Sequence, residues 1–174
     1  MVNTKNRKHI IRRIKFEEAE ALADLKIALS RETDFIPFLD LDRDTLVSYT
    51  KDELGQLPNN NRAIWIVEDA ENLIGYLNIY RYLMPKVSHA AFLEVGIRNY
   101  YQGLGIGTKL IHESELWAKS VGIKRIWFYV VADNLGAINL YLKLGYRFEG
   151  LRRDSYLLDG KFTDEYIMAK MLCA

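Results

Sequence analysis

The stretch Gln102-Gly103-Leu104-Gly105-Ile106-Gly107 decides the fold, because it joins an apolar strand pattern to a helical pattern. Glycines at such a junction let backbone N–H groups approach an anion, and the start of a helix adds its partial positive charge. A phosphate group is the ligand that this arrangement favours. Glycines also form ordinary tight turns, so a ligand role needs support from the rest of the chain.

Two well-known phosphate-binding patterns do not fit this turn. A P-loop requires Gly-Lys followed by Ser or Thr, whereas the order here is Gly107-Thr108-Lys109. The dinucleotide fingerprint requires G-x-G-x-x-G after the first strand of a βαβ unit, whereas these glycines alternate and lie past the middle of the chain. The turn therefore indicates another class of phosphate-containing ligand.

Strand and helix patterns lie on both sides of the turn. A helix is expected after it, from Gly103 to Val121, and Asn134 begins another that Gly145 ends. Before it, helices are expected over 16–30 and from Asp42 or Asp44 to about Leu54. Strands are expected over 9–14, 63–67, 73–83, 90–97 and 125–131, with a terminal hairpin over 146–171. The order β-α-α-β-β-β-α-β-α-β-β predicts one α/β domain over 1–174 with a mixed sheet.

The composition excludes several classes of protein. Hydrophobic residues make up 49% and charged residues 27%, with a formal net charge of +1, so no global charge favours nucleic acid or a membrane surface. The single cysteine, Cys173, and three scattered histidines predict neither a disulfide nor a metal site. No apolar run approaches the roughly 20 residues that span a bilayer. Without a signal-peptide pattern, a cytoplasmic protein is expected.

Three segments together resemble one family. Gln102, Gly105 and Gly107 fill the pattern Gln/Arg-x-x-Gly-x-Gly/Ala of the coenzyme A loop in the GCN5-related N-acetyltransferase (GNAT) family. The segment 134–146, NLGAINLYLKLGY, is similar to the second cofactor segment of that family, and 93–97, LEVGI, is similar to its central strand. The resemblance runs from about Leu73 to Met171 and includes Gly150, Arg153, Asp159-Gly160, Asp164 and Met168.

This resemblance implies a fold, a co-substrate and a reaction. It implies a twisted, mostly antiparallel sheet of about seven strands flanked by about four helices. It also implies transfer of an acetyl group from acetyl-CoA to a primary amine by direct attack in a ternary complex, with no metal, and is compatible with a homodimer. The residues that would bind the cofactor are Val95, Gly96, Ile97, Gln102, Gly103, Leu104, Gly105, Ile106, Gly107, Thr108, Asn134 and Lys143.

Two side chains are expected to carry the proton transfers. An amine attacks a thioester only when neutral, and Glu94 lies in an apolar strand where burial raises a carboxyl pKa toward that of a useful base. Glu94 would act directly or through water, although an ion-paired structural glutamate is the alternative. The resemblance implies that Tyr141 protonates the leaving thiolate; its alternative is an aromatic packing residue.

The acceptor site is defined least. Glu32 and Phe35 lie in the loop after the first helix, which walls the acceptor pocket in related enzymes. Tyr76 and Asn78 share one strand face and are expected to line the cleft. The sequence does not distinguish a small-molecule amine from a peptide amine, or acetyl from a longer acyl group. The main alternative from another class is a non-catalytic acyl-CoA-binding or sensor module on the same fold.

Overall fold

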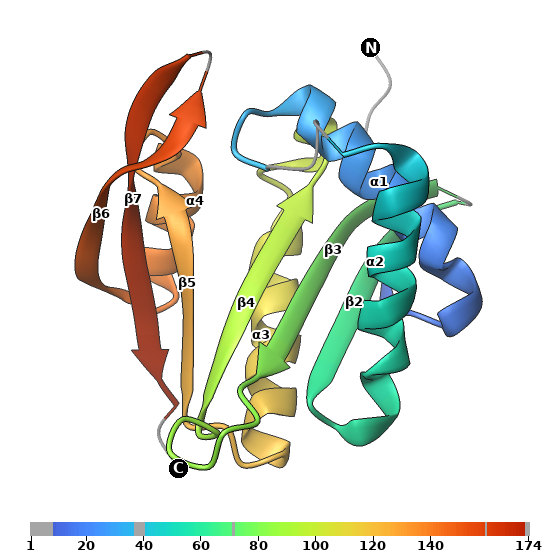
Figure 1. The fold of residues 1–174 in the computed structure, drawn as a ribbon, viewed down its shortest axis with the longest axis horizontal. Coiled ribbons are helices and arrows are strands. Elements are labelled where there is room, and N and C mark those ends of the chain that lie inside the picture. The colour runs from blue at the N-terminus through green and yellow to red at the C-terminus, as the bar shows by residue number, and fades with distance from the viewer. Residues whose placement is uncertain (1–8, 37–40, 71, 159, 173–174) are drawn as a thin grey trace.

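The computed structural model describes residues 9–36, 41–70, 72–158 and 160–172, and these contain one seven-stranded sheet (Figure 1). The strand order across the sheet is β1-β2-β3-β4-β5-β7-β6. The strands are β1 (Ile10–Arg13), β2 (Arg62–Asp69), β3 (Asn72–Arg81), β4 (Ala90–Ile97), β5 (Arg125–Val131), β6 (Arg147–Leu158) and β7 (Lys161–Met171). Only β4 and β5 pair in parallel. The predicted mixed, mostly antiparallel sheet is therefore confirmed.

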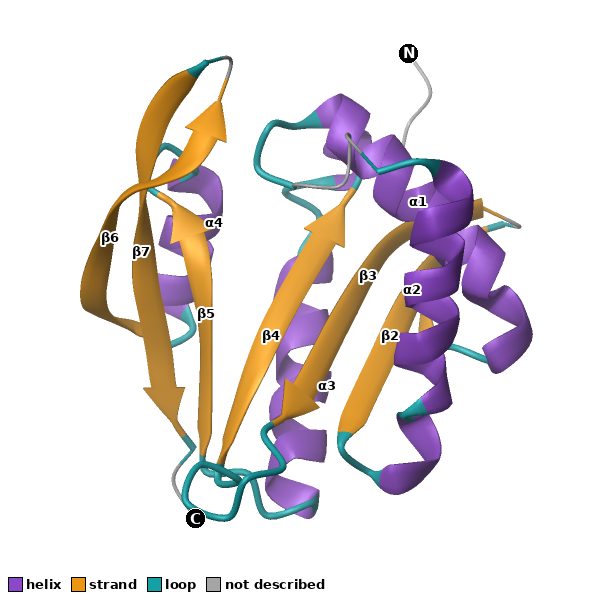
Figure 2. Cartoon of the chain, viewed as in Figure 1, coloured by secondary structure: helices purple, strands orange, loops and turns teal. Residues whose placement is uncertain are grey.

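Four α-helices cover the two faces of the sheet (Figure 2). Helices α1 (Ala19–Glu32) and α2 (Arg43–Gly55) lie on one face, and α3 (Ile106–Ser120) and α4 (Leu135–Lys143) lie on the other. Short 3₁₀ turns η2, η3 and η4 cover Phe16–Glu18, Leu57–Asn59 and Asn99–Tyr101. The described part of the chain thus has the three-layer arrangement that its β and α pattern predicts.

The apolar residues of the central strands divide between two cores. In β2, Ala63, Trp65 and Val67 pack on the α3 side, while Ile64 and Ile66 pack on the α1 side. This division follows from the alternation of side chains along a strand. The strand is buried on both faces, which explains its continuous apolar run.

The glycine turn shows where the predicted helix boundary was wrong. Gly103 and Gly105 have φ values of 75° and 78°, in the left-handed region that a right-handed helix cannot use. Helix α3 therefore begins at Ile106 rather than Gly103. The caps were predicted better: the side chain of Asp42 accepts from Thr45 N, and that of Asn134 accepts from Ala137 N.

Gly96 allows α1 to approach the sheet. A Cβ atom at Gly96 would lie 2.7 Å from Cδ1 of Leu29 and 2.9 Å from Cε1 of Tyr76. The missing side chain thus faces the α1 core, which gives Gly96 a packing role in addition to its predicted place among the cofactor-binding residues.

Replacing Gly96 by alanine is expected to lower the free energy of unfolding by about 1–3 kcal/mol, because the new methyl group overpacks this contact. Gly55→Ala is the control: no heavy atom lies within 4 Å of its Cβ position, and alanine in a helix is expected to be neutral or stabilising by up to about 1 kcal/mol. Chemical denaturation of both variants measures the difference. If the Gly96→Ala variant were as stable as the Gly55→Ala variant, Gly96 would have no packing role.

Candidate active site

Strands β4 and β5 separate partway along their length. Their register pairs only Ala90, Ala91 and Phe92 of β4 with Arg125, Ile126 and Trp127 of β5, and Figure 1 shows the two strands diverging beyond that point. Within the described part of the chain, the rest of β4 keeps its partner β3 but has no strand partner on the β5 side. A strand edge in this state offers backbone groups to another chain-like molecule.

The backbone of Val95 faces this open edge. On the other edge, Tyr82 N donates to Ala90 O, and Arg98 N donates to Ile74 O. Backbone groups alternate between the two edges of a strand, so the even-numbered residues of β4 bond to β3 and the odd-numbered ones face β5. The N–H and C=O of Val95 are thereby presented where β5 has turned away.

The glycine turn supplies a second set of backbone donors at the end of β4. The first hydrogen bond of α3 runs from Lys109 N to Gly105 O, so the N–H groups of Ile106, Gly107 and Thr108 precede the helix's own bonding pattern. Gln102 Nε2 donates to Ile97 O at 3.1 Å and ties the turn to the strand. Consecutive free N–H groups at a helix start form a cradle suited to a phosphate.

The second predicted cofactor segment contributes from α4. Asn134 caps this helix, since its Oδ1 accepts from Ala137 N at 3.1 Å. Lys143, at the other end of α4, lines a cavity of about 720 Å³ together with Thr108 and Lys109 of α3. The structure thus brings part of both predicted cofactor segments to one cavity. Gly107 helps this approach, because a Cβ there would lie 3.0 Å from Leu140 Cδ2.

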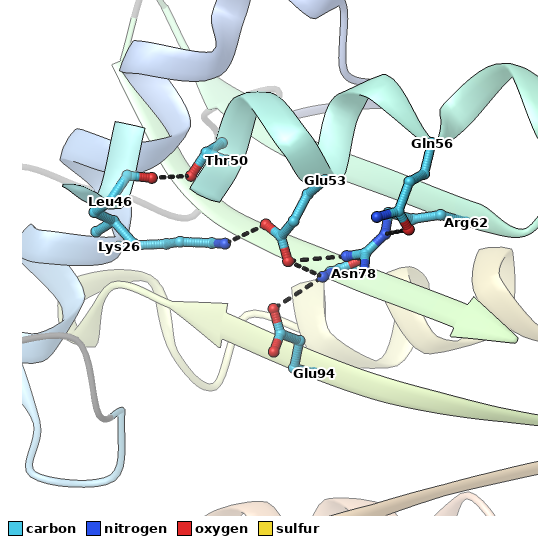
Figure 3. Close-up of polar contacts among 8 residues, drawn as sticks. All are labelled: Lys26, Leu46, Thr50, Glu53, Gln56, Arg62, Asn78 and Glu94. Atoms are coloured by element: carbon cyan, nitrogen blue, oxygen red, sulfur yellow. Dashed lines mark hydrogen bonds and ion pairs between the residues drawn. The ribbon is translucent and has the colours of Figure 1, made fainter. Parts of the chain in front are cut away.

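Glu94 lies on the opposite face of β4 from Val95, within a polar network under α1 and α2 (Figure 3). Asn78 Nδ2 donates to Glu94 Oε1 at 3.0 Å and to Glu53 Oε1 at 3.1 Å. Glu53 also accepts from Lys26 Nζ at 2.7 Å and from Arg62 Nη1 at 2.8 Å. Among the described residues, Glu94 Oε2 makes no hydrogen bond, so one carboxylate oxygen is held and the other remains available.

Burial raises the pKa of the Glu94 carboxyl above its ordinary value. The positive charge of Lys26 opposes that rise, the negative charge of Glu53 adds to it, and the hydrogen bond from Asn78 again opposes it. A raised pKa makes a carboxylate a better acceptor of an ammonium proton, which is what a general base for an amine requires.

Tyr141 lies on the other side of the sheet, in α4. Its side chain is 7% exposed, and its ring packs 4.2 Å, centroid to centroid, from that of Phe128 in β5. Burial raises its pKa, so the hydroxyl keeps its proton at neutral pH. Among the described residues the hydroxyl makes no hydrogen bond. Packing and proton donation are both compatible with this placement.

The expected acceptor residues lie in different settings. The Glu32 carboxylate accepts from Arg98 Nε at 2.7 Å and from Asn99 N at 2.9 Å. Burial favours the protonated acid, but these bonds hold the pKa of Glu32 below its ordinary value. Glu32 is the last residue of α1 rather than a loop residue, and it joins this helix to the segment that leads from β4 into η4. It is therefore not a free carboxylate for a cationic amine. Phe35 is partly exposed, and its N–H donates to Thr33 Oγ1.

The burial of Tyr76 and Asn78 contradicts the expectation that they line the cleft. Their exposed fractions are 2% and 0%. Tyr76 packs beneath α1, and the side-chain amide of Asn78 donates hydrogen bonds to Glu53 and Glu94. Asn78 thus contacts Glu94 and is not exposed to an acceptor.

Sequence reasoning missed Lys26, Glu53 and Arg62. One signal was present for Lys26, because it falls among Leu22, Leu25 and Leu29 on the apolar side of α1. A lysine in that stripe indicates a buried cation that needs a partner. Glu53 offered no such signal, since its pairing depends on how α2 is placed over β3.

A cavity of about 420 Å³ opens beside this network. It is lined by residues of α1, α2, the segment before α2 and β4: Lys26, Leu41, Leu46, Tyr49, Asp52, Glu53, Gln56 and Glu94. Glu94 is thus reachable from the α2 side of the sheet, while the open backbone of Val95 is reachable from the β5 side. The two sides meet at one strand.

An open strand edge, a helix start suited to a phosphate and a partly buried carboxylate on the same strand are features of an acyltransferase class of site. The model of the acetyltransferase (GNAT) family matches residues 27–146, and the chain belongs to this family.

Curated relatives are N-acetyltransferases. The chain is 29% identical over 101 residues to the L-amino acid N-acetyltransferase AaaT of Escherichia coli, covering 58% of this chain and 62% of that protein. It is 33% identical over 98 residues to the N-alpha-acetyltransferase RimI of Mycobacterium tuberculosis, covering 56% and 59%. The matches therefore span less than two thirds of each of these relatives.

Solved structures agree on the fold. A GNAT-family acetyltransferase from Streptococcus pneumoniae superposes with a TM-score of 0.84 at 26% identity, covering 94% of this chain and 99% of that chain. The structure of yncA from Salmonella typhimurium with its cofactor acetyl-CoA gives a TM-score of 0.76 at 16% identity, covering 95% and 94%. The second likeness bears on the fold alone.

The described residues contain neither a membrane-spanning helix nor a cluster of metal-binding side chains. None of the helices there is both long enough and apolar enough to cross a lipid bilayer. Nor does that part of the chain bring three or more His, Cys, Asp or Glu side chains together in a group that could hold a metal ion.

Proposed function

We propose that this chain is a cytoplasmic, single-domain N-acetyltransferase that transfers the acetyl group of acetyl-CoA directly to a primary amine in a ternary complex. The observation that carries the proposal is the divergence of β4 from β5 after Phe92. It leaves the backbone of Val95 open between the glycine cradle and Glu94. A sensor module would need the cradle but neither the partly buried Glu94 nor its network.

The residues present fit coenzyme A, because the N–H groups that begin α3 suit its pyrophosphate and the open edge of β4 suits its pantetheine amides. Asn134 offers its side-chain NH₂, and Lys143 adds a positive charge to the cavity that Thr108 also lines. When bound, acetyl-CoA supplies the acetyl group as a thioester.

Glu94 and Tyr141 then carry out the proton transfers. Glu94 Oε2 takes a proton from the incoming ammonium, directly or through water, so that the nitrogen lone pair can form the new N–C bond. Val95 N–H donates to the carbonyl oxygen as negative charge develops on it. As the C–S bond breaks, the electron pair stays on sulfur, and Tyr141 donates its phenolic proton there. The second proton that the nitrogen loses on becoming an amide passes through water to Tyr141 and replaces the one given to sulfur. The products are therefore an amide and a thiol, with the first proton on Glu94.

The test is a thiol-release assay with acetyl-CoA and a panel of primary amines. Thiol release that requires both the amine and the protein, with the N-acetyl product identified by mass spectrometry, supports the proposal. Acetyl-CoA binding without thiol release for any amine would favour the sensor module instead.

Asn78→Ala is expected to raise the pH at which amine acetylation reaches half its maximum rate. The Asn78 hydrogen bond lowers the Glu94 pKa, so its loss leaves a carboxyl that deprotonates at higher pH. Loss of a buried partner is also expected to cost about 1–3 kcal/mol of stability. The pH–rate profile separates the two effects, since a purely structural loss lowers the rate without moving its midpoint.

A further inference from the structure

A row of aromatic side chains crosses three strands beside Glu94. Tyr80 of β3 pairs in register with Phe92 of β4, and Phe92 pairs in register with Trp127 of β5. The ring centroids are 5.5 Å apart for Tyr80 and Phe92 and 5.0 Å apart for Phe92 and Trp127. Tyr82 stacks on Trp127 at 6.2 Å, and Tyr129 meets it edge-on at 5.1 Å. We call these five residues the aromatic floor.

The aromatic floor lies on the face of the sheet that carries α1 and α2, and it extends from β3 to β5, beyond the cover of these helices. Its residues alternate with Ile79, Leu93 and Phe128, which belong to the core on the α3 side. In Figure 2, α1 and α2 lie in front of β2 and β3, and no described helix lies in front of β5. All five rings are partly exposed, with Tyr129 at 36%. Contiguous aromatic surface of this kind usually marks a binding site.

The floor begins at the proposed base. Phe92 precedes Glu94 by two residues on the same face of β4, as Tyr80 follows Asn78 on β3. Burial raises the pKa of Tyr80 to about 12, and the negative charge of Glu94 is the next contribution to that rise. The Glu94 carboxylate therefore interacts electrostatically with the first ring of the row. The row also ends where β4 and β5 stop pairing, next to the open edge of Val95.

Cations already occupy both ends of the floor. The Arg62 guanidinium lies 4.6 Å from the ring centroid of Tyr80, and that of Arg152 lies 4.1 Å from the ring centroid of Tyr129. Each guanidinium is also paired with a carboxylate, Arg62 with Glu53 and Arg152 with Glu165, so neither carboxylate is free for a second ammonium group on the acceptor. The remaining surface, at Phe92 and Trp127, suits an uncharged planar group that stacks on or meets these rings edge-on.

We infer that the amine acceptor carries an aromatic ring, which packs on the aromatic floor while its primary amine reaches Glu94. This inference rests on the proposed function and names the acceptor class of the same site. One alternative is that the rings only pack against one another and bind no ligand. Another alternative is that a second copy of the chain covers them.

The test compares 2-phenylethylamine, hexylamine and 1,4-diaminobutane as acceptors in the thiol-release assay. The inference predicts that kcat/KM for 2-phenylethylamine exceeds that for each other amine by about tenfold, the ratio that one aromatic contact supports. Trp127→Leu and Tyr129→Leu are expected to bring the ratio of 2-phenylethylamine to hexylamine toward one. Phe162→Leu, a 70% exposed aromatic outside the floor, is expected to keep the wild-type ratio.

Separate readouts distinguish the failures. Acetyl-CoA binding by calorimetry and turnover of any amine test the proposed function, whereas the ratio tests the aromatic acceptor. Equal turnover of all three amines, or a preference for the diamine, would overturn the inference and leave the acetyltransferase intact. A concentration-dependent dimer that dissociates in Trp127→Leu would likewise overturn it in favour of a second copy. Saturation-transfer NMR of 2-phenylethylamine, measured with coenzyme A present, reports ring contact even if a variant turns over poorly.

Discussion

Glu94→Gln is expected to lower kcat/KM for amine acetylation by about 10²–10⁴-fold, the usual contribution of a positioned general base. Gln has nearly the same shape as Glu, and its carbonyl oxygen can still accept from Asn78 Nδ2, so the network keeps its geometry. What is lost is the group that takes the proton. Steady-state thiol release measures the change, and Glu149→Gln, which removes a carboxylate paired with Arg125 in the opposite half of the sheet, is the control.

The change of the acetylation rate with pH provides a second test of this prediction. Because burial raises the Glu94 pKa, wild-type activity is expected to rise with pH through that raised value as the carboxylate becomes free to accept a proton. The Gln variant has no such group and is expected to lose this limb of the profile. Activity within threefold of wild type, with the limb intact, would remove Glu94 from the mechanism.

Stability is expected to move in the opposite direction from activity. A carboxyl whose pKa is raised by folding favours the folded state when protonated, so its contribution is fully present below the unfolded pKa of about 4.3 and is lost as pH rises through the folded pKa. At neutral pH the charged carboxylate is therefore a cost that Gln does not have. Thermal unfolding should show the Gln variant at least as stable as wild type, which excludes unfolding as the cause of lost activity.

How much of this site could be predicted from sequence depended on whether the signal was local. The bounds of β4, 90–97, and the cap at Asn134 follow from a short apolar run and a capping residue, and both were confirmed. The predicted start of α3 was three residues too early. The sequence of the glycine turn is compatible with a helix start, but Gly103 and Gly105 have left-handed φ values that a right-handed helix excludes.

The network around Glu94 and the aromatic floor depend on contacts between distant segments. Asn78 reads as one polar residue in an apolar strand, and only the placement of α2 brings Glu53 onto it. Similarly, Tyr80, Phe92 and Trp127 read as three ordinary strand residues, and only the register of β3, β4 and β5 sets them in a row. Periodicity predicts which face a residue takes but not which residues meet there.

Gly105→Trp is expected to reduce acetyl-CoA affinity by about 100-fold or more, equivalent to about 2.8 kcal/mol. The Cβ position of Gly105 meets no heavy atom within 4 Å, so the added ring would occupy the space in front of the N–H groups that begin α3. Those N–H groups are the proposed donors to the pyrophosphate. Calorimetric titration of acetyl-CoA measures the change.

The same helix offers a closely matched control. Gly122, just beyond the other end of α3, has φ +80° against +78° at Gly105, and its Cβ position is equally open. Tryptophan at either position therefore carries a similar cost for left-handed backbone, about 1–2 kcal/mol. Gly122→Trp is expected to lose a similar amount of stability and to bind acetyl-CoA like wild type. If both variants lost affinity equally, backbone strain would explain the loss, and the glycine turn would not be the phosphate cradle. If only Gly105→Trp loses it, the helix end that holds the cofactor is identified independently of any acceptor.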